Sequence, residues 1–187
     1  MLLATKKLII LLDLSGHAKA FQTHTDEEMA RLLQDYYFGC DTILTAKGGK
    51  VIKFIGDGCL ATFPLNQAKS AVEAVVELRS KVKAIAERHK VNVELGANLH
   101  TGELIEGEFG AGENRRLDIV GRAVNQTFLL GRGAGIRISE PVYRALPSAA
   151  RSSWRKHKPP AIYQLETLGA GLYEGMGKDP ATNIQRW

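Results

Sequence analysis

Two aspartates in this chain of 187 residues stand where carboxylates can do chemistry. Asp57 lies between Gly56 and Gly58, in a tight connection between two short apolar runs that is typical of a β-hairpin. Asp13 follows another apolar run, and the two side chains meet at one sheet edge if these strands are neighbours. Adjacent carboxylates repel each other unless a cation lies between them, and hard oxygen ligands select Mg²⁺ or Mn²⁺. The residues alone leave two interpretations open: a metal site for phosphoryl chemistry, or a turn and a strand end without metal.

The elements that must position these aspartates follow from the periodicity of apolar residues. Thr25 and Glu28 form a capping-box pattern at the start of a helix, and Asn66 is the expected cap of a second helix. In chain order we expect a strand at 8–14, a helix after 25 that ends at 48–49, hairpin strands at 51–55 and 59–63, a helix from 66 that includes 71–85, and strands at 91–100 and 103–109. We then expect a polar loop at 110–116, a short apolar run at 117–120, a helix at 122–130, a strand at 136–138, a short helix at 139–146, a basic loop at 151–160 and a strand at 161–165.

This order of elements predicts an α+β fold with a ferredoxin-like βαββαβ core and additional C-terminal α/β elements. Such a sheet is mostly antiparallel, with helices on one face, and the strand at 8–14 is apolar enough to be buried on both faces. The expected domain covers residues 1–168, and residues 169–187 form a Gly-rich tail with little periodicity.

Composition limits the class of protein. With 44% hydrophobic and 24% charged residues, the chain matches an ordinary soluble globular protein. A net charge of +5 suits a small polyanionic ligand, and no basic block with interleaved aromatic residues points to nucleic acid. No apolar run approaches the roughly 20 residues that cross a bilayer. Cys40 and Cys59 lack metal-ligand spacing, which predicts reduced, buried thiols and a cytoplasmic location.

Four stretches together resemble the catalytic domain of class III nucleotidyl cyclases, the adenylyl and guanylyl cyclase family. They lie at 11–16, at 53–63, at 99–102 with Gly107, and at 117–125, and the resemblance spans roughly 8–165. It implies that Asp13, Asp57 and the backbone carbonyl of Leu14 bind Mg²⁺ or Mn²⁺. These ions would lower the pKa of the ribose 3′-hydroxyl of ATP and neutralise charge on the α-phosphate and the pyrophosphate leaving group.

The same resemblance assigns residues that bind the nucleotide. Lys53 and Asp118 match the base-selecting pair of adenylyl cyclases. Adenine offers an acceptor at N1 and a donor at its exocyclic amine, so a lysine donor and an aspartate acceptor complement it and favour ATP over GTP. Asn125 matches the asparagine that orients the ribose.

The terminal phosphates are assigned by a looser match. Arg155, counted back from Tyr163, takes the place of the family's phosphate-binding lysine, with Lys156 and Lys158 as alternatives.

Two positions depart from the family pattern. Leu129 stands where the family has an arginine that stabilises phosphate charge in the transition state, and losing such a donor typically costs about 10²-fold or more in rate. Arg132 lies seven residues after Asn125, on the same face if the helix continues, and is the candidate substitute. His17 replaces the aromatic residue that usually follows Gly16.

The resulting prediction is an adenylate cyclase domain that converts ATP to 3′,5′-cyclic AMP and pyrophosphate. Because the family divides each active site between two subunits and this chain carries both halves, the resemblance implies a homodimer with two equivalent sites. Leu129 keeps a second interpretation open, in which the same fold binds nucleotide with little or no turnover. A ferredoxin-like nucleic-acid-binding module is a third, which the lack of an aromatic ladder disfavours.

Overall fold

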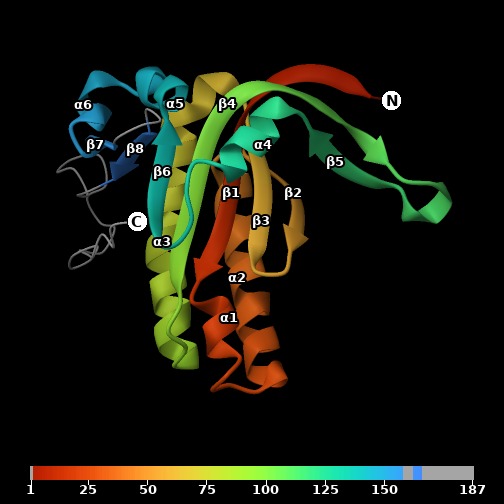
Figure 1. Cartoon of the computed structure of the whole chain (residues 1–187), viewed down its shortest axis with the longest axis vertical. Helices are drawn as coiled ribbons and strands as arrows, with labels where there is room; N and C mark the ends of the chain where they lie inside the picture. The colour runs from red at the N-terminus through yellow and green to blue at the C-terminus, as the bar shows by residue number, and fades with distance from the viewer. Residues whose placement is uncertain (1, 158–161, 166–187) are drawn as a thin grey trace.

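The structure is a computed structural model that describes residues 2–157 and 162–165 (Figure 1). Its elements in chain order are β1 (Leu3–Ser15), α1 (His17–Ala20), α2 (Asp26–Ala46), β2 (Lys50–Ile55), β3 (Gly58–Phe63), the 3₁₀ helix η1 (Leu65–Gln67), α3 (Ala68–His89), β4 (Glu94–Phe109), η2 (Gly112–Asn114), β5 (Arg116–Val120), α4 (Arg122–Phe128), β6 (Gly135–Ser139), α5 (Glu140–Ala145), α6 (Ser148–Arg151), β7 (Trp154–His157) and β8 (Ile162–Leu165). Within these ranges the strands form one sheet in the order β2-β3-β1-β4-β6-β8-β7, and β5 pairs with β4 outside this path. The neighbours are antiparallel except β4 and β6. The α+β class and the ferredoxin-like core with C-terminal additions are confirmed.

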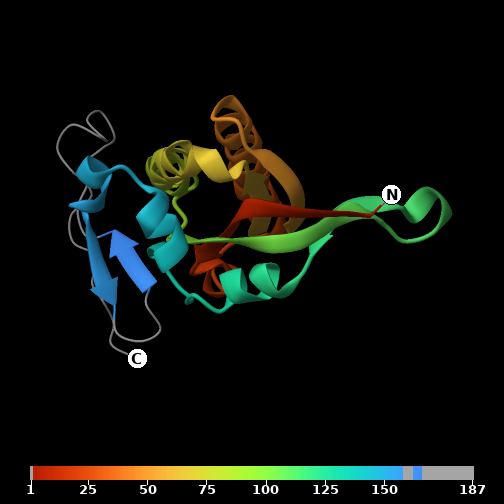
Figure 2. The same cartoon turned by 90° about the horizontal axis from the view of Figure 1, so that it is seen from above.

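Strand β1 lies in the middle of the sheet because its residues are apolar on both faces. Leu8, Ile10 and Leu12 belong to the main core between the sheet and helices α2 and α3, whereas Ile9 belongs to a smaller cluster on the opposite face. Figure 2 shows α2 and α3 on one side of the sheet and α4 on the other. The expectation that helices cover one face only is therefore wrong, because the second cluster includes Ala123 of α4.

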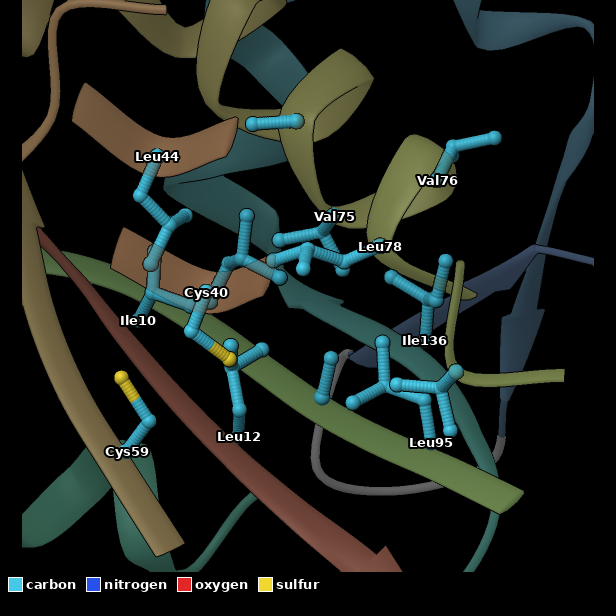
Figure 3. Packing of buried hydrophobic residues seen from close by; sticks show 14 of the residues in the cluster. Ile10, Leu12, Cys40, Leu44, Cys59, Val75, Val76, Leu78, Leu95 and Ile136 are labelled. Carbon is cyan, nitrogen blue, oxygen red and sulfur yellow. The ribbon is translucent and has the colours of Figure 1, made fainter. Parts of the chain in front are cut away.

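The two cysteines lie inside the main core. Cys40 of α2 and Cys59 of β3 are free thiols with no exposed surface, and both point into the cluster that Figure 3 shows. A hydrogen bond with Cys40, and then burial, raise the pKa of the Cys59 thiol far above its ordinary range. The predicted buried thiols are confirmed.

The helix starts show which capping signals act. The Thr25 hydroxyl accepts a hydrogen bond from the Glu28 amide (3.3 Å), and the Glu28 carboxylate accepts one from the Thr25 amide (2.8 Å), so the predicted capping box is present. The predicted cap at Asn66 is wrong. This residue lies within η1, and α3 begins after Gln67.

Strand β4 is continuous from Glu94 to Phe109, so the predicted break at residues 101–102 is also wrong. Strand β1 begins at Leu3, earlier than expected, and pairs with β4 without interruption from there to Ser15. Gly102 marks a close approach rather than a turn: a Cβ atom there would lie 2.5 Å from that of Ala123 in α4.

The predicted basic loop at 151–160 contains helix α6 in its first residue and then strand β7, which pairs with β8. Only Trp154 of this strand is buried, while the other three residues are exposed, so the sequence has no alternating pattern to reveal it. The rest of that loop, the start of the final strand at Ala161, the domain limit at 168 and the tail at 169–187 lie outside the described residues.

Candidate active site

The pairing of β1 with β3 brings the two aspartates together. Leu12 faces Cys59 across the ladder, so Asp13 lies beside the tip of the β2–β3 hairpin, where Asp57 occupies the turn. The Leu14 amide donates a hydrogen bond to Oδ2 of Asp57 (3.3 Å), which fixes this carboxylate against the end of β1. Loss of hydration, then the charge of Asp57 and a hydrogen bond with it, raise the pKa of Asp13. The predicted meeting of these carboxylates is observed.

This donor set fits a divalent cation. Because burial and the charge of Asp57 raise the pKa of Asp13, a cation between the two carboxylates would relieve their repulsion. No cluster of three or more His, Cys, Asp or Glu side chains suited to a metal occurs in residues 2–157 and 162–165. Two carboxylates alone suit Mg²⁺, which keeps several waters and takes further ligands from substrate phosphates.

His17 contacts Asp57, and the sequence did not predict this contact. Its Nδ1 lies 3.5 Å from Oδ1 of Asp57, and its side chain is 12% exposed. Its Nε2 is buried and has no partner among the described residues, and the ring packs edge-on against Phe21. The signal was the exchange of an aromatic residue for an ionisable one directly after Gly16.

Tyr37 is a second residue that the sequence did not single out. Its hydroxyl donates to the carbonyl of Gly56 in the hairpin turn, and its ring stacks on Phe54 of β2 with the centroids 4.1 Å apart. Burial, and then the charge of Asp57, raise the pKa of Tyr37. Tyr37 thus attaches the turn that carries Asp57 to helix α2.

Lys53 and Asp118 form an ion pair. Nζ of Lys53 donates to Oδ2 of Asp118 over 2.6 Å, and Oδ1 of Asp118 accepts from the Ile119 amide over 2.8 Å. The two side chains are 37% and 25% exposed, so the pair is accessible from solvent. Strand β5 makes this contact possible by folding back along β4.

Helix α4 is shorter than predicted, and this changes the position of Arg132. The helix ends at Phe128 with Leu129 as its C-cap, so the argument that Arg132 shares a helical face with Asn125 is wrong. Asn125 is exposed on the helix, Leu129 is 78% exposed, and Arg132 is exposed in the loop that follows.

Arg155 lies on β7, at the far edge of the sheet from the hairpin. In the described part of the chain, no hydrogen bond or ion pair joins Asn125 to the Asp13–Asp57 pair or to the Lys53–Asp118 pair, and none joins these two pairs to each other. One copy of the chain therefore assembles the Asp13–Asp57 pair and the Lys53–Asp118 pair but does not join them into one site.

Comparison with known proteins identifies the family to which this α+β domain belongs. The profile of the adenylate and guanylate cyclase catalytic domain matches residues 5–169. The chain therefore belongs to this family.

Individual relatives are distant. An adenylate cyclase from Anabaena cylindrica is 23% identical over 157 residues, which cover 76% of this chain but only 31% of that protein. The chain thus spans about a third of the length of this relative.

Solved structures share the fold. A guanylyl cyclase crystal structure has a TM-score of 0.79 at 22% identity, covering 94% of this chain and 98% of that one. The adenylyl cyclase CyaB from P. aeruginosa has a TM-score of 0.77 at 21% identity, covering 88% and 95%. A guanylyl cyclase domain from Blastocladiella emersonii, described as dimeric, has a TM-score of 0.72 at 16% identity, covering 87% and 97%. Among the described residues, no helix is both long and apolar enough to cross a membrane.

Proposed function

We propose that this chain is an adenylate cyclase domain that converts ATP to 3′,5′-cyclic AMP and pyrophosphate. The observation that carries the proposal is the meeting of Asp13 and Asp57 at the end of β1, in a chain that belongs to the cyclase family. These carboxylates, with the backbone carbonyl of Leu14, would hold Mg²⁺ or Mn²⁺. When bound, the metal supplies the charge that activates the ribose 3′-hydroxyl and stabilises the departing pyrophosphate.

The protein's own side chains bind and orient the nucleotide in this proposal. Nζ of Lys53 keeps two N–H bonds beyond the one that it gives to Asp118, so it can donate to N1 of adenine. The Asp118 carboxylate accepts from the exocyclic amine. Guanine presents a carbonyl and a protonated N1 at these positions, which reverses the polarity and favours ATP. Asn125 orients the ribose, and Arg155 binds the terminal phosphates.

The proposed active form is a homodimer with active sites at the interface. One chain holds the carboxylate pair and the base-selecting pair as separate groups, and a two-fold arrangement gives each site one pair from each copy. The exposed position of Asn125 on α4 leaves it accessible to the second copy.

A direct assay tests the proposal. Purified protein is incubated with ATP or GTP and Mn²⁺, and cyclic product is scored by chromatography. Cyclic AMP that disappears on Asp57→Asn substitution is the expected result. Absence of cyclic product at high protein concentration contradicts the enzyme proposal.

Base selection has its own test. Joint replacement of Lys53 and Asp118 by alanine should remove the preference for ATP over GTP, because no donor and acceptor remain to read the base. An unaltered ratio of the two rates contradicts the assignment, whatever the absolute activity.

Leu129 favours a second candidate function, a cyclase fold that binds nucleotide and turns it over slowly or not at all. A leucine that is 78% exposed offers no donor to a phosphate. Introducing one with Leu129→Arg should raise the rate of cyclic product about tenfold or more if this missing donor limits catalysis. Tight ATP binding without product in both proteins would favour the second candidate.

A further inference from the structure

The loop of residues 131–135, here called the glycine loop, has its carbonyl groups turned inward. The amide Nδ2 of Asn98 donates to the carbonyl of Gly131 over 2.9 Å. The guanidinium of Arg137 donates to the carbonyl oxygens of Arg132 (2.7 Å), Gly133 (3.1 Å), Ala134 (2.9 Å) and Gly135 (3.5 Å). One buried amide and one guanidinium thus engage the carbonyl groups of the whole loop.

The amide groups of the same loop are left without acceptors. No backbone or side-chain acceptor contacts the N–H groups of residues 131–134 within the described ranges 2–157 and 162–165. Gly131, Gly133 and Gly135 have φ angles of 154°, 79° and 104°, so positive and negative φ values alternate along the loop. Successive N–H groups form anion-binding concavities where the backbone turns through a residue of left-handed φ, as it does at Gly133.

Arg137 also places a positive charge directly beneath the loop. Arg137 is half-buried, and no carboxylate pairs with it in the described part of the chain. Burial lowers the pKa of its guanidinium, which reflects the cost of holding this charge away from water without a counter-charge. Arg132 adds an exposed guanidinium on the outer side.

The glycine loop lies at the same end and on the same face of the sheet as the aspartates. Asp13 of β1 faces Gly96 of β4, which faces Gly135 of β6, so the three form one row across the sheet. Leu95 points into the main core, so its neighbour Gly96 presents the opposite face, as Asp13 does. A Cβ atom at Gly96 would lie 2.5 Å from the carbonyl oxygen of Gly133, which shows that the loop packs directly on this row.

We propose that the glycine loop binds the phosphate chain of the nucleotide beside the carboxylates of its own chain, with the N–H groups of residues 131–134 and the Arg132 guanidinium as donors. The identity of the ligand rests on the proposed function, whereas the affinity for a polyphosphate rests on the loop alone. In this arrangement the loop supplies the hydrogen-bond donors to phosphate that a leucine at position 129 cannot supply. These donors belong to the same chain as Asp13 and Asp57.

Inorganic tripolyphosphate is the probe, titrated into the full chain by calorimetry with a chelator present, so that no metal contributes. Gly133→Asp places a carboxylate in the open space beside the loop, since no atom lies within 4 Å of a Cβ at this position. Gly133→Asn is the matched control, because asparagine has the same size and tolerates a positive φ. Arg132→Gln is compared with Arg115→Gln, an exposed arginine after η2 at the tip of the β4–β5 connection.

We expect Gly133→Asp to weaken tripolyphosphate binding about tenfold or more relative to Gly133→Asn, and Arg132→Gln to weaken it about fivefold. Arg115→Gln should bind like the unmodified chain. Equal affinities of the two Gly133 variants, or no binding to the unmodified chain, overturn the inference. Binding that follows this pattern in a protein that makes no cyclic product supports the inference and contradicts the proposed function alone.

Discussion

The two clustered carboxylates dominate the chemistry at the scale of single residues. Because burial and the charge of Asp57 raise the pKa of Asp13, its ionisation in the folded chain is opposed by its neighbour. A carboxylate pair of this kind lowers the stability of the metal-free protein and makes it responsive to divalent cations.

Asp13→Asn should therefore raise the melting temperature of the metal-free protein by a few degrees at neutral pH. A raised pKa in the folded state means that stability is lost as pH rises above the ordinary value of 3.8, so the difference should shrink in acid. Differential scanning fluorimetry at several pH values measures it.

The same measurements include a control variant and a comparison with and without Mn²⁺. Asp41→Asn, at an exposed position of α2, should leave the melting temperature unchanged. Mn²⁺ should stabilise the unmodified chain but not Asp13→Asn. Equal stabilisation of both proteins would show that Mn²⁺ binds elsewhere.

At the scale of elements, the contact between β4 and α4 positions the helix that carries Asn125. The Cβ of Ala123 fills the space above Gly102, so helix α4 lies as close to the strand as its backbone allows. Any side chain at residue 102 must push the helix outward, together with Asn125.

Gly102→Ala should lower the free energy of unfolding by about 1–3 kcal/mol, because it overpacks a contact of 2.5 Å. Ala123→Gly opens the same space from the other side. The double variant should be less destabilised than the sum of the two single variants, as measured by urea denaturation. Strict additivity would show that the two positions do not share this space.

A charged cluster joins the middle of α2 to the C-terminal end of α3. Oδ2 of Asp35 lies 2.6 Å from both Nε2 of His89 and the guanidinium of Arg88. The hydrogen bond with His89 is the main cause that lowers the pKa of Asp35. A lowered carboxyl pKa stabilises the fold above the ordinary value of 3.8, and this contribution is lost as pH falls through the folded-state pKa.

Asp35→Asn should accordingly lower the free energy of unfolding by about 0.5–1 kcal/mol at pH 6, because the pair is partly exposed. The loss should shrink as pH falls through the folded-state pKa of Asp35, because the variant and the unmodified residue are then both neutral. Glu27→Gln removes a more exposed pair with Arg31 and serves as the control, with a smaller effect expected. A loss that is as large at pH 2 as at pH 6 would contradict the electrostatic explanation.

Sequence signals predicted an element correctly where all the residues that define it lie close together in the chain. The capping box at Thr25 and the apolar run of β1 each contain, within a few residues, the interactions that define them. The continuity of β4 and the strand β7 depend instead on partners far along the chain. Gly102 resembles a turn until Ala123 is placed over it, and a strand with one buried residue has no periodicity to detect.

For the whole molecule, the separation of the Asp13–Asp57 pair from the Lys53–Asp118 pair leads to a test of the proposed dimer. If each site takes its carboxylates from one chain and its base-selecting pair from another, two variants with little or no turnover of ATP can complement each other. Mixing Asp57→Asn with the Lys53/Asp118 double alanine variant gives heterodimers with one intact site. Random exchange should restore about a quarter of the unmodified cyclase activity. A mixture as inactive as its parts, with exchange verified by native mass spectrometry, contradicts a shared site.

The candidate site was predictable in parts. The assignments named Asp13 and Asp57, which the structure brings together at the end of β1, and Lys53 and Asp118, which form an ion pair. Arg132 was assigned by extending a helix past glycines that end it. The glycines at 131 and 133 indicated only where the helix ends, and the structure was needed to show that Arg137 turns the carbonyl groups of the loop inward.

The attachment of the hairpin turn to α2 has a consequence for local opening. Because Tyr37 is bonded to the carbonyl of Gly56 and stacked on Phe54, the turn cannot separate from the sheet without also breaking contacts with the long helix. Hairpin tips usually fray at little cost, and their amide hydrogens exchange with solvent almost freely. Here the amides around Asp57 should exchange at rates closer to those of α2, and Tyr37→Leu should release them without speeding exchange at the centre of β4.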